Sequence, residues 1–395
     1  MTLPYDPPLR GIRVLELARI LAGPWCGQVL ADLGADVVKV ERSGAGDDTR
    51  AWGPPFMEGP QGEQLEAAYF HGCNRGKRSV VADFETEEGR ALVRHLAGHA
   101  DVVLENFKVG GLQKYGLDAE TLRASHPQLI YASITGFGQT GPDAPRPGYD
   151  FLIQGLGGAM QMTGEPEGAP MKSGIAISDI FTGLYAANAI QAALLRRART
   201  GEGATIDCAL LDTQVSVLGY QAMNYFVSGI EPARYGNGHP NIVPYDVYPA
   251  QDGNFLIACG NDGQFRRLVA ALGAPELASD PIFATNAARV INRVAVDARL
   301  SELSRGFLRE PLLAALEAAG VPAGAVNKTS EVFVNPQVAH RQMRLDLANP
   351  RLKGGSSPGL RSAFMIDGHI GAAERPAPGL GEHQGDVLND PAWGG

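Results

Sequence analysis

Apolar and polar positions follow two periods along roughly the first half of the chain. Short apolar runs predict buried strands at residues 13–17, 36–41, 79–83, 101–107, 129–135 and 204–208. Between several of these runs, apolar residues recur at helical spacing and predict helices at residues 23–34, 86–97, 151–160 and 179–200. Strands that alternate with helices indicate a mainly parallel sheet with helices packed on it. The first half of the chain is therefore predicted to be a Rossmann-like α/β domain.

The pattern changes after residue 229. Two apolar runs flank Asp252 and Gly253, which predicts a β-hairpin, and helices follow at residues 264–272, 294–303 and 311–318. These elements indicate a smaller α+β domain. We expect a large domain made of residues 1–205 and 330–395, a linker helix at residues 206–229, and the small domain at residues 230–329.

Composition excludes several classes of protein. A net charge of −9 argues against a nucleic-acid-binding surface. The four cysteines are far apart and fit neither a disulfide framework nor a CxxC metal pair, and His95 and His99 lack the glutamate of a zinc-protease motif. The N-terminal residues have no signal-peptide character and no apolar run reaches the roughly 18 residues of a membrane span. We expect a cytoplasmic protein without a metal site.

One acid stands out in the stretch from Lys172 to Gly183. Asp179 lies at a predicted helix start that is otherwise lined with small and apolar residues, with Ser178 as the expected N-cap. A carboxylate at a helix N-terminus is kept ionised by the helix dipole, and it can attack an activated acyl group. Asp179 is therefore the candidate nucleophile, and the alternative is an ordinary first-turn acid.

Basic residues gather in two places in this acidic chain. Arg42 and Arg50 flank a glycine-containing loop after the second strand, where open α/β sheets bind ligands. Residues 74–78 include Lys77 and resemble a phosphate-binding loop, but the position that would bind magnesium holds Arg78. A phosphate-binding cluster that needs no magnesium, or a plain charged surface, are the two interpretations. The first loop lacks the glycines of an NAD site.

Several short blocks in the same order resemble the CaiB/BaiF-type family III CoA-transferases over nearly the whole length. They are residues 11–17, 22–24, 33–42, 46–47, 74–79, 103–107, 174–183, 200–203 and 380–383. Residues 46–56 and 242–245 look most like the branch of succinate/hydroxymethylglutarate CoA-transferases. This resemblance implies CoA transfer from an acyl-CoA, such as succinyl-CoA, to a dicarboxylic acid.

The resemblance also implies site residues and an assembly. Asp179 is expected to form an acyl anhydride and then a CoA thioester, with no metal, ATP or tightly bound cofactor. The expected contacts with coenzyme A are Ile20, Arg42, Lys77, Asn106, Phe107 and Lys114. The functional unit is expected to be an interlocked homodimer with the active site near the subunit interface.

Some positions depart from the formyl-CoA transferase pattern or from the related racemases. Thr135 and Phe137 occupy places where formyl-CoA transferase has a lysine and a tyrosine, which argues against oxalate and formate as substrates. Tyr149 stands where the racemases have a catalytic histidine, and a tyrosine is a poor base at neutral pH. We hypothesise that Arg50 pairs with the distal carboxylate of the acceptor. The alternatives are an α-methylacyl-CoA racemase and a non-catalytic CoA-binding protein.

Overall fold

The computed structural model describes residues 5–395, and the chain divides into two compact units. The first unit consists of Met1–Ala159, Ser173–Ala222 and Pro336–Gly395, and the second of Met160–Lys172 and Met223–Asn335. Residues 1–4, which belong to the expected large domain and to the N-terminus expected to carry no signal, lie outside the described residues. Within residues 5–395, none of the helices combines the length and the hydropathy that a membrane span requires.

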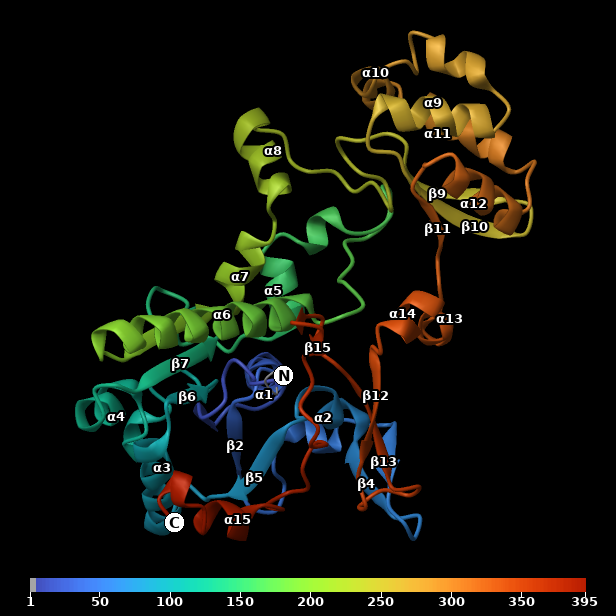
Figure 1. Cartoon of the computed structure of the whole chain (residues 1–395). Coiled ribbons are helices and arrows are strands. Elements are labelled where there is room, and N and C mark those ends of the chain that lie inside the picture. Colours follow the sequence, from blue (N-terminus) through green and yellow to red (C-terminus); the bar gives the residue numbers. More distant parts are fainter. Residues whose placement is uncertain (1–4) are drawn as a thin grey trace. The chain divides into compact units, whose positions relative to one another are not determined.

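A six-stranded parallel sheet organises the first unit (Figure 1). Its strands are β1 (Arg13–Glu16), β2 (Asp36–Glu41), β5 (Lys77–Val81), β6 (Val102–Glu105), β7 (Ile130–Thr135) and β8 (Ala204–Ala209). In space they are ordered β5-β2-β1-β6-β7-β8, and all five neighbouring pairs are parallel. Counted along the chain, this is the 3-2-1-4-5-6 order of the dinucleotide-binding folds. The expected Rossmann-like sheet is confirmed, and its strand order reverses between β1 and β6.

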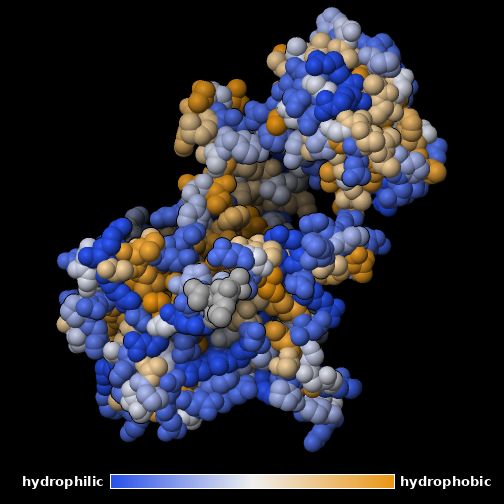
Figure 2. Space-filling view, in the orientation of Figure 1, coloured by the Kyte–Doolittle hydropathy of each residue, from blue (hydrophilic) through white to orange (hydrophobic). Residues whose placement is uncertain are grey.

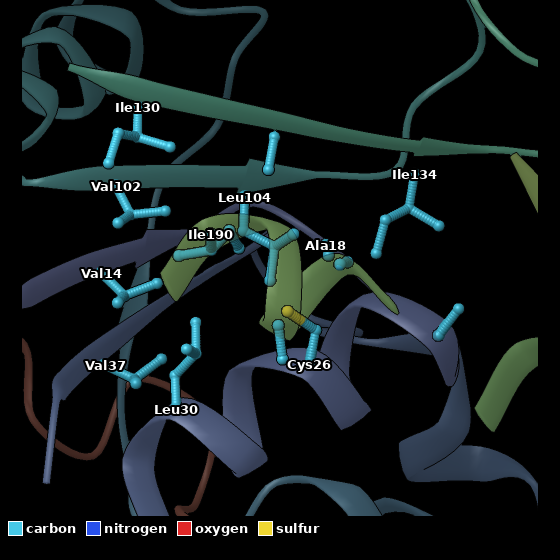
Figure 3. Close-up of a cluster of buried hydrophobic side chains, with 14 of the residues drawn as sticks. Val14, Ala18, Cys26, Leu30, Val37, Val102, Leu104, Ile130, Ile134 and Ile190 are labelled. Carbon is cyan, nitrogen blue, oxygen red and sulfur yellow. The ribbon is translucent and has the colours of Figure 1, made fainter. Parts of the chain in front are cut away.

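Helices cover both faces of this sheet. Side chains of α1 (Ala22–Asp32) and α6 (Ile177–Thr200) share one core with the sheet, and side chains of α3 (Glu87–His99) and α4 (Ala119–Ser125) share the other. Figure 3 shows the first core, in which strand residues such as Val14, Val102 and Ile130 lie across from Cys26, Leu30 and Ile190. These strand residues are fully buried, as parallel strands covered on both faces require.

The remaining elements of the first unit are short. Its other helices are α2 (Ala68–Cys73), α5 (Asp150–Leu156), α7 (Leu210–Ser216), α14 (Pro336–His340) and α15 (Gln384–Leu388). Three two-stranded sheets are formed by β3 (Phe56–Glu58) with β4 (Gln64–Ala67), β12 (Arg344–Ala348) with β13 (Ser356–Leu360), and β14 (Met365–Ile366) with β15 (His369–Ile370). The hairpin of β12 and β13 has no counterpart in our reading of the sequence.

The second unit is an α+β structure with its own core. The strands β9 (Tyr245–Ala250) and β10 (Gly253–Ala258) form the expected hairpin, and β11 (Ala323–Ala325) pairs with β10. Its helices are α9 (Asp262–Ala271), α10 (Asn286–Ile291), α11 (Arg293–Ser304), α12 (Arg309–Ala318) and α13 (Thr329–Val334). The core joins this sheet to α9, α11 and α12, among others.

The segment at residues 206–229 is not one linker helix. Its first residues complete β8, and the helix expected beyond them is divided into α7 and α8 (Tyr220–Ser228). Gly219 lies between these two helices with a positive φ of 54°, a conformation that glycine adopts without the steric cost other residues meet. The expectation of a single continuous helix was therefore wrong.

Candidate active site

A cavity of about 130 Å³ lies where the strand order of the sheet reverses. Open α/β sheets bind ligands at this position because the loops after two neighbouring strands diverge there. One wall is formed by residues 19–22 after β1, and another by residues 106–109 after β6. The segment 134–136, residues 144 and 146–149, and Leu210 complete the lining around Asp179.

Asp179 is the acidic residue that lines this cavity, and it lies in the first turn of α6. Burial, together with the nearby carboxylate of Asp150, raises the pKa of Asp179 to about 7. No lysine or arginine forms an ion pair with Asp179 within residues 5–395. A carboxyl group in this environment is partly ionised near neutral pH and is more basic than an ordinary aspartate.

The start of α6 differs from the expectation. The helix begins at Ile177, its N-cap is Ala176, and Ser178 lies inside the first turn. Ser178 is therefore not the N-cap. Its backbone N–H donates to Oδ1 of Asp150 at 2.8 Å, and its hydroxyl donates to Oε1 of Gln214 at 2.8 Å. The capping acceptor comes from α5, which sequence spacing alone does not reveal.

Ile20 is held in a conformation that β-branched residues rarely adopt, with a φ of 73°. Its backbone N–H donates to both carboxylate oxygens of Asp47 at 3.2 Å, and Asp47 pairs with the buried Lys39 at 2.9 Å. The amide of Asn106 fixes the preceding residue, since it accepts from the N–H of Arg19 at 2.9 Å and donates to its carbonyl at 2.6 Å. These bonds hold the loop after β1 against the cavity.

A second pocket of about 290 Å³ is lined by Arg42 and by two residues, Arg19 and Phe107, that also line the first. The ring of Phe107 stacks on Phe84 with their centroids 5.9 Å apart. Lys114 lies outside the lining of this pocket, but its Nζ is 4.3 Å from the centroid of Tyr115, which is part of it. Five of the six expected CoA contacts thus lie in or beside two adjoining pockets.

Lys77 is the exception among these six residues. It is fully buried, and its Nζ lies 2.8 Å from Oε2 of Glu16 and 3.0 Å from Oδ1 of Asn74. The neighbouring arginines of the 74–78 cluster pair with carboxylates as well, Arg75 with Asp32 and Arg78 with Asp36. A phosphate-binding cluster needs exposed donors, and these cations point inward. The structure therefore contradicts the assignment of Lys77 as a phosphate ligand.

Arg50 is also an internal residue. Its guanidinium donates to both oxygens of Glu41 at 2.8 and 2.7 Å and to Glu66 at 3.0 Å, and it lies 3.7 Å from the ring centroid of Phe70. The side chain is 7% exposed. Because its donors are engaged by buried carboxylates, the structure contradicts the hypothesis that Arg50 holds the distal carboxylate of an acceptor.

Tyr149 and Phe137 occupy different positions. Tyr149 lines the first cavity and is 60% exposed, so it is available to a ligand there. Phe137 is buried in the first core, and the guanidinium of Arg146 lies 4.8 Å from its ring centroid. Arg146 itself lines the cavity. Phe137 thus supports a residue of the cavity wall rather than forming that wall.

Sequence reasoning missed Asp150, Gln214 and Asp47, which hold the cavity wall through hydrogen bonds. Asp150 follows Tyr149, the position already compared with the racemase histidine, and Asp47 belongs to the block at residues 46–47. Both carboxylates lie in segments that the sequence had already singled out, but the sequence did not show which backbone N–H group each would accept from.

Among residues 5–395, no group of three histidine, cysteine or acidic side chains has the geometry of a metal site.

Comparison with known proteins gives a consistent result over nearly the whole chain. Residues 9–384 match the family model described as CoA-transferase family III. The chain is 56% identical over 382 residues to succinate–glutarate CoA-transferase of Agrobacterium fabrum, covering 97% of this chain and 95% of that protein. It is 39% identical over 383 residues to human succinyl-CoA:glutarate CoA-transferase, covering 97% and 86%. A CaiB/BaiF family protein from Brucella suis has a similar crystal structure, with a TM-score of 0.86, 56% identity, and coverage of 97% and 99%.

Proposed function

The chain belongs to CoA-transferase family III, and from this premise we propose that it moves coenzyme A from succinyl-CoA to a dicarboxylic acid such as glutarate, with Asp179 as nucleophile. The relatives named for succinate and glutarate support this choice of substrates. The observation that carries the role of Asp179 is its place in the cavity at the reversal of strand order, beside Ile20 and Asn106.

The proposed reaction has four steps. The carboxylate of Asp179 attacks the thioester carbonyl of succinyl-CoA, which forms a mixed anhydride and releases CoA thiolate. The thiolate attacks the Asp179 carbonyl of the anhydride, which releases succinate and leaves an aspartyl-CoA thioester. The acceptor carboxylate attacks the carbonyl of that thioester, which forms a second mixed anhydride between Asp179 and the acceptor and releases the CoA thiolate again. The thiolate then attacks the acyl carbonyl of the acceptor, which yields the new acyl-CoA and restores the carboxylate of Asp179.

A carboxylate suits this sequence because its anhydride is as reactive as a thioester. A serine ester would be too stable to return the acyl group readily. The four steps balance without ATP or a metal ion, since each reactive bond is exchanged for another of similar energy. The raised pKa of Asp179 makes its carboxylate a stronger base, and therefore a better nucleophile once it is ionised.

We assign the two adjoining pockets to the two ends of coenzyme A. The thioester lies in the first cavity near Asp179, and the nucleotide end lies in the second pocket. There the side chain of Arg42, which pairs with Asp48 at 2.7 Å, is 57% exposed and can still reach a phosphate. Asn106 and Phe107 lie after β6, with Phe107 in the lining of both pockets. Lys77 has no part in this assignment because it is buried.

The distal carboxylate of the acceptor requires a cation other than Arg50. Three basic residues line the first cavity, namely Arg19, Lys108 and Arg146. We propose that one of them pairs with this carboxylate. Arg146 is the first to test, because it lines the cavity and the buried ring of Phe137 supports its guanidinium from behind the wall.

The homodimer implied by the family resemblance is also part of this proposal. Helix α8 supports it, since Met223, Phe226 and Val227 are 57%, 73% and 83% exposed. Figure 2 shows hydrophobic side chains gathered on this helix. An apolar surface of this kind is typical of a segment that packs against another chain.

The cytoplasmic location stays a prediction.

Isotope exchange tests the proposed function. Purified protein is incubated with succinyl-CoA and ¹³C-labelled glutarate, without ATP and with a chelator, and labelled glutaryl-CoA is measured by mass spectrometry. We expect rapid formation of glutaryl-CoA, and a loss of at least about a thousandfold in Asp179→Ala. Substantial activity in Asp179→Ala would contradict the assigned nucleophile. Loss of α-deuterium from a 2-methylacyl-CoA without transfer would favour the racemase.

A further inference from the structure

The helix that carries Asp179 begins without a capping side chain of its own. Its N-cap, Ala176, has no side-chain acceptor, although α6 is 24 residues long. The first N–H groups of a helix have no partner within the helix, and leaving them unpaired in a buried place is costly. Oδ1 of Asp150 accepts from the N–H of Ser178 at 2.8 Å and lies 3.4 Å from the N–H of Asp179. A carboxylate from α5 therefore caps the nucleophile's own turn.

The capping carboxylate is itself held by a buried amide. Oδ2 of Asp150 accepts from Nε2 of Gln154 at 2.7 Å, and Oε1 of Gln154 accepts from the N–H of Ser173 at 2.9 Å. Gln154 is 1% exposed. One chain of hydrogen bonds thus joins Asp150 to both ends of the segment that leads into α6.

A second buried amide supports the same turn from α7. Gln214 is 1% exposed and accepts from the hydroxyl of Ser178 at 2.8 Å. The turn that carries Asp179 is therefore fixed from two helices, one on each side in the sequence. Of these supports, Asp150 alone brings a negative charge.

No ion pair among the described residues neutralises that charge, although Arg19, Lys108 and Arg146 line the cavity that contains Asp179. Within residues 5–395, neither Asp150 nor Asp179 forms an ion pair. The titratable groups that interact with Asp179 are Asp150 from α5 and Tyr69 from α2, and the pKa of Tyr69 is itself raised to about 12 by burial and by surrounding anions that include Asp179. The positive end of the α6 dipole opposes this repulsion in part.

We propose that Asp150 is a positioning residue with two roles: its oxygen fixes the backbone of the nucleophile Asp179, and its charge keeps that carboxylate strongly basic. This inference rests on the proposed role of Asp179. The first role sets the direction from which the carboxylate meets the thioester. The second sets how readily the ionised carboxylate attacks, because nucleophilicity follows basicity.

Two substitutions separate these roles. Asp150→Asn keeps an oxygen acceptor for the N–H of Ser178 but removes the charge, whereas Asp150→Ala removes both. In Asp150→Asn we expect the acidic limb of the kcat/KM profile to move about one unit toward lower pH, with kcat on the plateau reduced several-fold. In Asp150→Ala we expect kcat to fall about a hundredfold with KM changed much less, because the nucleophile is misplaced.

Asp118→Ala is the matched control. Asp118 caps α4 by accepting from the N–H of Thr121 at 3.1 Å, and it does not line either of the two pockets assigned to coenzyme A. This variant loses a helix-capping carboxylate elsewhere in the first unit. We expect its melting temperature to fall and its kcat and pH profile to match the wild type.

Hydrogen exchange gives a readout that does not depend on catalysis. The peptide covering residues 173–183 should exchange faster in Asp150→Ala than in the wild type, and only slightly faster in Asp150→Asn. If the peptide exchanged at wild-type rates in Asp150→Ala, the positioning role would be wrong. If the pH limb of Asp150→Asn stayed in place, the role of its charge would be wrong.

The Asp179→Ala variant distinguishes failure of this inference from failure of the proposed function. Activity that survives in Asp179→Ala contradicts the nucleophile, and it then also contradicts the roles of Asp150 in catalysis. The exchange of residues 173–183 would still show whether Asp150 holds the start of α6. Should Asp150→Ala fail to fold, Asp150→Asn alone still decides the role of the charge through its pH profile.

Discussion

Residues 74–78 and residues 172–183 carry charge in very different surroundings. In the first segment, Arg75, Lys77 and Arg78 pair with acidic side chains of neighbouring elements, and all three are at most 7% exposed. In the second, Asp179 lies in a cavity, forms no ion pair among the described residues, and has its pKa raised by burial and by the charge of another acid, Asp150. The dense cluster of charge is structural, and the isolated acid is the candidate nucleophile.

The difference lies in whether each charge has a compensating partner. Burial of a charge is tolerable when an opposite charge and hydrogen bonds accompany it, and such pairs contribute to a single folded arrangement. A charge buried beside a like charge raises the free energy of the folded state, and this arrangement is common at catalytic sites. The number of charges in a segment is therefore a weaker sign of function than the absence of a counterion.

The largest expected effect is on stability, from breaking one pair of the structural cluster. Arg75→Met leaves Asp32 buried without its cation, so we expect the free energy of unfolding to fall by about 3–5 kcal/mol. Urea denaturation measures this loss. The control is Arg94→Met, which removes an exposed pair with Glu87 and should cost no more than about 1 kcal/mol. Equal losses in the two variants would contradict the structural role of the cluster.

At the cavity, we expect that removing a charge increases the free energy of unfolding instead of lowering it. The pKa of Asp179 is raised from 3.8 to about 7, so the ionised group disfavours the folded state. This cost is absent below about pH 4, grows as the pH rises toward about 7 and is constant above that. Asp179→Asn should therefore increase the free energy of unfolding by about 1–2 kcal/mol near pH 8, after allowance for partial solvent screening.

Denaturation of Asp179→Asn at about pH 8 and at about pH 4 measures this gain, which should shrink at the lower pH. Asp143→Asn, at an exposed acid paired with Arg146, is the comparison variant and should change stability little. If Asp179→Asn were less stable than the wild type at about pH 8, the charge of Asp179 would be stabilised by its surroundings, contrary to this prediction.

The activity of the wild type should follow the ionisation of the same carboxylate. Because Asp179 attacks as an anion, kcat/KM should rise about tenfold per pH unit below about pH 7 and then reach a plateau. Initial rates of glutaryl-CoA formation from succinyl-CoA between about pH 5.5 and 8 provide the profile. A flat profile over this range would argue that Asp179 titrates far lower than its surroundings imply.

The smallest expected effect concerns Arg50. Arg50→Lys keeps a cation beside Glu41 and Glu66, so the KM for glutarate should stay within about twofold of the wild type. Arg146→Gln, at a residue that lines the cavity, should raise that KM several-fold and leave the KM for succinyl-CoA nearly unchanged. Steady-state kinetics with each substrate varied in turn makes the comparison. If the KM for glutarate rose several-fold in Arg50→Lys and stayed unchanged in Arg146→Gln, the original hypothesis for Arg50 would be restored.

Local patterns predicted much of the fold correctly. The central strands β1, β2, β6 and β7 were visible because buried parallel strands are largely continuous apolar runs, and α6 was visible through its apolar face and Gly201 at its C-terminal end. The start of α6 was placed two residues too late, with Ser178 instead of Ala176 as the N-cap, because the capping carboxylate comes from α5. A contact between residues as far apart in the sequence as Asp150 and Ser178 leaves no periodic pattern of apolar and polar residues.

The sequence by itself determined the Rossmann-like sheet, the separate α+β hairpin region, the family resemblance and the choice of Asp179. These depend on the spacing of apolar residues and on short motifs, which are local properties. The tertiary structure alone decided which charges face inward, and it turned Arg50 and Lys77 from expected ligands into partners of buried acids. It also placed Asp150 beside Asp179. Pairing and burial of charge depend on residues that the fold brings together from distant parts of the chain, and the electrostatic effect of each residue follows from those neighbours.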